Sequence, residues 1–202
     1  MFKKFAADAL GISDVGVIVG PADYNKVDAD DYLFSEDGEQ IFFLIKSKMD
    51  EYCFTNLALI HVDGDSAVSS KRTIKRYEYA SHQISGVSIE TAGTLDMDIE
   101  LKFALDETRF SIDVKKSFIE QLKDVYKALI TIGKQQRRDA VCRKHALQAL
   151  EATTSVHKLN IAPEGGTLTT QFNALLDALN TAVLDTHTKR DFSDVFTKYI
   201  HN

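Results

Sequence analysis

Apolar and polar residues alternate along residues 97–114, and this is the clearest pattern in the chain. A turn near Asp106 separates the alternation into two runs. The apolar positions are Met97, Ile99, Leu101, Phe103, Phe110, Ile112 and Val114. A period of two is that of a β-strand with one buried face, so the stretch predicts two strands paired across a turn.

The period changes to that of a helix directly after the second run. One stripe then holds Phe118, Leu122, Val125, Tyr126, Leu129 and Ile130. Gly133 follows where a left-handed cap would end the helix. Because a helix next to strands buries its apolar stripe against them, we expect this helix to close a β-barrel or sandwich.

Four further stretches carry strand patterns, over residues 40–47, 52–62, 73–79 and 84–91. Asn56 marks a tight turn within the second, and Asp63-Gly64 is a hairpin signal. Ala92-Gly93 predicts another turn. About seven short strands followed by a helix are typical of a closed or nearly closed antiparallel structure.

The C-terminal third is helical in pattern, with helices expected over residues 135–152 and 168–185 and a short last helix after Asp191. Because the barrel already has its lid, we expect these helices to leave apolar surface for a partner. The alternative is that the tail folds back on its own barrel and the protein is a monomer. The predicted partner-binding residues are Phe172, Leu175, Leu176, Leu179, Phe192 and Phe196. The expected domains are an N-terminal helix with an acidic connector (1–29), the β domain with its lid (30–134) and a helical extension (135–202).

Composition and charge restrict the partners and the compartment that we expect. The net charge of -6 over 202 residues provides no global attraction for nucleic acid or anionic lipid. Cys53 and Cys142 lie in patterned segments, so two buried thiols and a reducing cytoplasm are expected. No apolar run is long enough to span a bilayer. The stripe at Phe2, Phe5, Ala6 and Leu10 favours a short docking helix, with a membrane-surface helix as the alternative.

Motifs that carry catalysis or metal binding are missing from the sequence. None of the six histidines lies in a nucleophile motif, and neither H-E-x-x-H, C-x-x-C nor a phosphate-binding loop occurs. We therefore expect no catalytic residues, no cofactor, no metal and no enzymatic activity.

Lysine and arginine residues gather in two clusters along the chain. Lys71, Arg72, Lys75 and Arg76 lie in and beside a predicted strand, where edge charges that prevent aggregation are the favoured interpretation and an anionic-ligand site is the alternative. The second cluster, on one predicted helix, favours a solvated face over nucleic-acid binding. It consists of Lys134, Arg137, Arg138, Arg143 and Lys144.

Residues 90–98 read E-T-A-G-T-L-D-M-D, with Phe54-Thr55-Asn56 and Asp37-Gly38-Glu39 upstream. These motifs resemble the bacterial pleckstrin-homology (PH)-like domain family over residues 30–133, and the helical tail resembles the extension of YvbH-like proteins. The resemblance implies a seven-stranded bent β-sandwich or barrel closed by a C-terminal helix, and an oligomerisation extension. The chain departs from the family pattern at Ala58, where arginine is frequent, and at Ala80-Ser81, where Pro-Tyr is frequent.

The expected function is therefore a non-enzymatic scaffold or adaptor that forms a homo-oligomer and binds protein partners. A membrane-surface or anionic-ligand binding module is the alternative, and an unrecognised enzyme is a third hypothesis. Nucleic acid is not an expected partner, and a membrane surface is not favoured.

Overall fold

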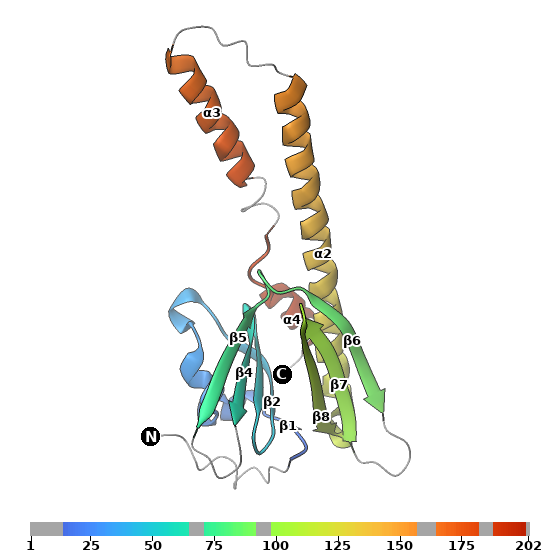
Figure 1. The fold of residues 1–202 in the computed structure, drawn as a ribbon. Helices are drawn as coiled ribbons and strands as arrows, with labels where there is room; N and C mark the ends of the chain where they lie inside the picture. The colour runs from blue at the N-terminus through green and yellow to red at the C-terminus, as the bar shows by residue number, and fades with distance from the viewer. Residues whose placement is uncertain (1–13, 65–70, 92–97, 157–164, 182–187, 201–202) are drawn as a thin grey trace. The chain divides into compact units, whose positions relative to one another are not determined.

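The computed structural model describes residues 14–64, 71–91, 98–156, 165–181 and 188–200 (Figure 1). The chain divides into two compact units. We call residues 1–133 together with 190–202 the β unit, and residues 134–189 the helical unit. The expected N-terminal helix and the turn at Ala92-Gly93 lie outside the described residues.

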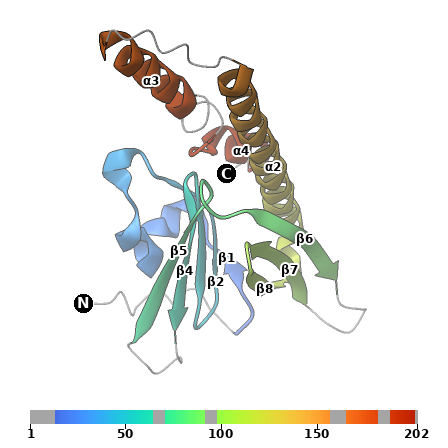
Figure 2. The same cartoon turned by 45° about the horizontal axis from the view of Figure 1, so that its top comes forward.

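Two antiparallel sheets form the β unit (Figures 1 and 2). The first has the order β1-β2-β3-β4-β5 and the second the order β6-β7-β8. Backbone hydrogen bonds of Gly16 join β1 to β8, including Gly16 N–H to Asp113 O at 2.8 Å. The strands are β1 Val17–Ile18, β2 Ile41–Lys46, β3 Glu51–Thr55, β4 Ala58–Gly64, β5 Arg72–Glu78, β6 Ile84–Thr91, β7 Asp98–Leu105 and β8 Thr108–Lys115.

The predicted strand pair is confirmed as β7 and β8, with Leu101 opposite Ile112 and Phe103 opposite Phe110. Burial alternates along β7 as the period of two requires. Asp106 adopts a left-handed φ of 51° in the turn between the strands. Asn56 likewise separates β3 from β4, so the apolar run over 52–62 is two strands, as its turn signal predicted.

The segment between β1 and β2, which includes part of the acidic connector, has regular structure. Beyond β1 it forms three 3₁₀ helices, η1 Pro21–Lys26, η2 Asp28–Tyr32 and η3 Ser35–Asp37. Val27 and Ala29 of this segment pack with Leu44 in a small second core. On the opposite face of β2, Phe43 and Ile45 belong to the main core, which explains why this strand is apolar on both faces.

Helix α2, Ile119–Val156, follows η4, Lys116–Phe118, and begins as the predicted lid. Its buried residues in the β unit are Leu122, Val125, Ala128, Leu129 and Ile132, which belong to the main core. The prediction that Gly133 ends this helix is wrong, because α2 continues for more than twenty residues beyond it. A Cβ atom at Gly133 would lie 2.7 Å from Ile84 O, so glycine is needed for the close approach of α2 to β6.

Replacing Gly133 with alanine is expected to lower the free energy of unfolding by about 1–3 kcal/mol, because the added methyl group displaces backbone in a packed core. The helix propensity of alanine acts in the opposite direction and by itself would raise the free energy of unfolding by roughly 1 kcal/mol. Urea unfolding measures the change. Gly20→Ala is the control, since no atom lies within 4 Å of a Cβ atom there. A Gly133→Ala variant as stable as the wild type would contradict the close contact.

Helix α4, Ser193–Tyr199, returns to the β unit. Phe192 and Phe196 are fully buried there. The Phe196 ring stacks on Phe42 with centroids 5.3 Å apart, and the Phe192 ring meets Tyr79 edge-on at 5.8 Å. The prediction that these two phenylalanines form exposed partner surface is therefore corrected. Their apolar stripe completes the core of their own chain.

Candidate assembly surface

The Phe54-Thr55-Asn56 motif builds a polar corner at the end of the first sheet. The side-chain oxygen of Asn56 accepts a hydrogen bond from Gln40 N–H at 2.9 Å. Its amide nitrogen donates to Gly38 O at 3.3 Å and to Asp191 Oδ2 at 3.0 Å. The Phe192 N–H donates to Asn56 O at 2.9 Å. The motif therefore anchors the segment that leads into α4.

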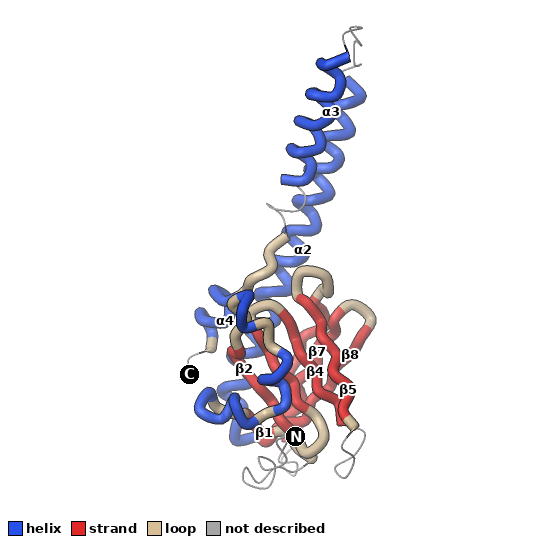
Figure 3. Tube along the Cα trace, turned by 90° about the vertical axis from the view of Figure 1, so that its left-hand side faces the viewer, coloured by secondary structure: helices blue, strands red, loops and turns tan. Residues whose placement is uncertain are grey.

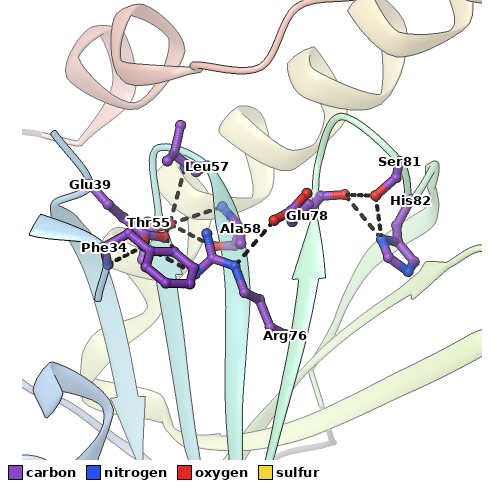
Figure 4. A network of polar contacts seen from close by, with 9 residues as sticks. All are labelled: Phe34, Glu39, Thr55, Leu57, Ala58, Arg76, Glu78, Ser81 and His82. Atoms are coloured by element: carbon purple, nitrogen blue, oxygen red, sulfur yellow. Dashed lines mark hydrogen bonds and ion pairs between the residues drawn. The ribbon is translucent and has the colours of Figure 1, made fainter. Parts of the chain in front are cut away.

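Glu39 is the buried charge of this corner (Figure 4). The Arg76 guanidinium donates from one nitrogen to both carboxylate oxygens at 3.0 Å, and Thr55 Oγ1 donates to Glu39 Oε1 at 2.5 Å. The guanidinium carbon also lies 4.6 Å from the centroid of the Phe34 ring. Because the buried carboxylate has both a charge partner and hydrogen bonds, the corner is a structural network.

Residues on both sides of the helical unit are held within the β unit. On the entry side, Gln83 Nε2 donates to Gly133 O at 3.1 Å. On the return side, the Tyr199 hydroxyl lies 3.2 Å from Thr131 Oγ1 of α2. The helical unit is thus a segment inserted between two core elements of the β unit, α2 and α4, rather than a terminal tail.

The helical unit contains the second half of α2 and helix α3, Gly165–Asn180, both drawn as blue helices in Figure 3. Among the residues of this unit whose burial the structure describes, Asp139 alone is buried, with 8% of its surface exposed. Its carboxylate accepts a hydrogen bond from Gln135 Nε2 at 2.8 Å. Arg143 donates to Thr188 Oγ1 at 3.3 Å.

The apolar stripe predicted on α3 is present and remains largely exposed. Phe172 is 61% exposed and Leu176 is 42% exposed, while Leu175 and Leu179 are half-buried. Val141 and Leu147 of α2 are also exposed. Four of the six predicted partner-binding residues therefore lie together on α3, whereas Phe192 and Phe196 lie in the core of the β unit.

Residues 9–132 match the family model described as the bacterial PH domain. The chain belongs to the bacterial PH domain family. Residues 144–202 match a second model, described as the YvbH-like oligomerisation region. This second match includes α4, so it extends from the helical unit into the core of the PH domain, as we call the β unit from here on.

Two relatives cover nearly the whole chain. The uncharacterized protein YvbH of Bacillus subtilis (strain 168) is 52% identical over 206 residues and covers all of both chains. A crystal structure of a PH-domain-containing protein from Exiguobacterium sibiricum 255-15 is 41% identical. It superposes with a TM-score of 0.86, covering 93% of this chain and 100% of that one.

The basic residues singled out near β5 have acidic neighbours in the PH domain. Arg72 Nε lies 3.8 Å from Asp28 Oδ2, and Lys75 Nζ lies 3.2 Å from Asp63 Oδ2. Arg76 pairs with Glu39, and Lys71 is exposed. The four residues are close in sequence, but three of them are directed to three different carboxylates.

Several ionisable groups of the PH domain have structural surroundings and contacts. Glu51 accepts hydrogen bonds from Ala29 N–H at 2.8 Å and from Lys46, which holds η2 against the sheet. Burial and then the Glu51 charge raise the pKa of Asp28. Burial also raises the pKa of Cys53 well above its usual value, which keeps this thiol protonated and unreactive.

His61 lies beside a carboxylate, with its Nε2 3.1 Å from Asp50 Oδ1. Its ring stacks on Tyr52 with centroids 4.5 Å apart. These contacts give His61 a structural role in the first sheet. In the described part of the chain, no group of three or more His, Cys, Asp or Glu residues is arranged to hold a metal ion. Within the same ranges, no helix has the length and apolarity needed to cross a membrane.

The packing of Gly133 and the anchoring role of Asn56 did not follow from the sequence, and the return of α4 to its own barrel was only the alternative expectation. Phe192 and Phe196 have the spacing of an apolar helix face. That spacing does not show which surface the face packs against. Asp191 carried a partial signal, since the last helix was expected to begin after it. Its Oδ1 accepts a hydrogen bond from Ser193 N–H at 2.7 Å, while its Oδ2 binds Asn56 in the polar corner.

Proposed function

We propose that the protein is a non-enzymatic scaffold that assembles with copies of itself through the helical unit and presents its PH domains to protein partners. The observation that carries this proposal is the exposed stripe of α3, in a unit whose described residues include no buried apolar side chain. Burying a large apolar side chain stabilises by about 1.5–3 kcal/mol, so the stripe favours association. The match to an oligomerisation region over 144–202 supports the same proposal.

A second copy of the chain is the partner that this stripe fits best. Homo-oligomers are the commonest soluble assemblies, and a symmetric contact places the same patch on both sides of the interface. Phe172 and Leu176 lie four residues apart on one helix face, where they can pack against the same pair in another copy. The half-buried Leu175 and Leu179 extend this face along α3.

The alternative, a membrane-surface or anionic-ligand module, has less support. Its candidate residues were Lys71, Arg72, Lys75 and Arg76, and three of these already meet carboxylates of their own chain. A ligand anion at this position would have to compete with Asp28, Asp63 and Glu39.

The double variant Phe172→Glu, Leu176→Glu is expected to convert the oligomer to a monomer, because it places like charges across the proposed contact. Light scattering at a protein concentration of tens of micromolar and moderate salt measures the molar mass of the assembly. The matched control, Asn173→Glu with Asn180→Glu, adds the same charge beside the stripe and is expected to leave the mass unchanged. Thermal melting should show an intact PH domain in both variants.

A monomeric wild-type chain, or a stripe variant that keeps the wild-type mass, would overturn the proposal. Point variants are preferable to truncation at residue 134, since truncation would also remove Phe192 and Phe196 from the core of the PH domain.

A further inference from the structure

The pairing of charges on α2 changes at the boundary between the two units. In the lid half, Lys123 pairs with Glu120 at 2.7 Å and Lys127 pairs with Asp124 at 2.9 Å. After Gly133 the basic side chains have no such acids three residues earlier. Asp139, the acid closest to these basic residues in the sequence, is buried and hydrogen-bonded to Gln135. No ion pair of the kind seen in the lid half joins Lys134, Arg137, Arg138 or Lys144 to another described residue.

Apart from Arg143, the basic residues of this half share one helix face. At 3.6 residues per turn they fall within an arc of roughly 120°. Every one of them is exposed, and no ion pair joins them to another described residue. Val141, 52% exposed, lies in the middle of the arc. We call this face the basic stripe: Lys134, Arg137, Arg138, Val141, Lys144 and His145.

A second charged surface lies on the segment between β1 and β2 of the PH domain. Several acids of this segment have basic partners: Asp23 pairs with Lys26, and Glu39 with Arg76. Glu36 and Asp37 are exposed, and no ion pair joins them to another residue in the described ranges. Phe34 beside them is 50% exposed. We call this surface the acidic ledge: Asp31, Tyr32, Phe34, Glu36 and Asp37.

The two surfaces have the same layout with opposite charge. Each has an exposed apolar residue, Val141 or Phe34, with charged residues before and after it along the chain. An apolar centre with a charged rim is the usual anatomy of a protein interface. Two basic stripes would repel each other, so the stripe cannot be the self-complementary contact proposed for α3. Its partner has to be acidic, and the ledge is present at the same concentration as the stripe.

We propose that the basic stripe of one copy docks on the acidic ledge of a second copy. This contact deepens the proposed self-assembly, on which it rests, by joining α3-linked oligomers through a second interface. Because stripe and ledge are different surfaces, the contact is heterologous. It therefore extends the assembly or closes it into a ring.

The test uses a pair of charge-reversal variants in the full chain. The stripe variant is Arg137→Glu with Arg138→Glu, and the ledge variant is Glu36→Lys with Asp37→Lys. Light scattering is recorded at about 20 mM and at about 500 mM salt, where screening removes contacts between exposed charges. The wild type is expected to be about twofold or more heavier at low salt. Each variant alone is expected to have the same mass at both salt concentrations.

An equimolar mixture of the two variants is the decisive sample. A reversed stripe on one chain meets a reversed ledge on the other, so the low-salt mass of the wild type is expected to return. The high-salt mass reports the α3 contact and should be unchanged in both charge variants. Only the variant Phe172→Glu, Leu176→Glu is expected to fall to the mass of a monomer at high salt. The α3 contact and the contact between stripe and ledge can therefore be refuted independently.

A wild-type mass independent of salt would overturn the inference, as would a mixture that stays at the high-salt mass. The latter result is expected if stripe and ledge meet within one chain. Anionic phospholipid vesicles and duplex DNA are tested in parallel. One outcome is that the wild type binds vesicles or DNA and the stripe variant does not, while the mixture does not recover the low-salt mass of the wild type. The basic stripe would then be a polyanion-binding surface, and the inference would be wrong.

Discussion

Replacing Phe196 with alanine is expected to lower the free energy of unfolding of the PH domain by about 3–5 kcal/mol, the usual cost of removing a buried phenylalanine ring. The residue lies near the end of the chain, where truncation is often harmless. Here its ring is fully buried, stacked on Phe42 and 6.2 Å from the centroid of Tyr79. Urea unfolding followed by circular dichroism measures the change.

Thr197→Ala is the matched control, because Thr197 is the next residue of α4 and is exposed. A surface change of this kind is expected to shift stability by no more than about 0.5 kcal/mol. If Phe196→Ala behaves like Thr197→Ala, α4 does not pack in the core of the PH domain. The predicted boundary of a single extension at residue 135 would then stand.

Replacing Leu129 with aspartate is expected to unfold the PH domain altogether. Leu129 is buried among the lid residues of α2, so its replacement places an unpaired carboxylate in an apolar core. The cost of several kcal/mol is comparable with a typical total stability of about 5–15 kcal/mol. Loss of the cooperative thermal transition, with loss of the near-ultraviolet circular dichroism signal, is the expected result.

Gln121→Asp introduces the same charge on the exposed face of α2 and is expected to keep the transition. A Leu129→Asp variant that melts cooperatively at the wild-type temperature would show that the first half of α2 is not the lid of the sheets. Because the two variants share a helix and a charge, only the burial of the replaced residue distinguishes them.

The candidate assembly surface was predictable only in part. The stripe at Phe172, Leu175, Leu176 and Leu179 follows from a helical period, and the structure places it on α3. Phe192 and Phe196 have a similar pattern, yet they are buried. An amphipathic pattern shows that a helix has an apolar face, but it does not show whether the covering surface belongs to the same chain or to another.

Local periodicity by itself determined the strands from β2 to β8, the turns at Asn56 and Asp106, and the lid half of α2, because backbone geometry maps each period onto one secondary structure. Only the tertiary structure decided what each apolar face meets. It places α4 in the core through Asn56 and Asp191, 135 residues apart in the chain. It also explains Gly133 by the nearness of Ile84 O. Such contacts depend on pairs of distant residues, and a pattern read along one segment contains no record of its partner.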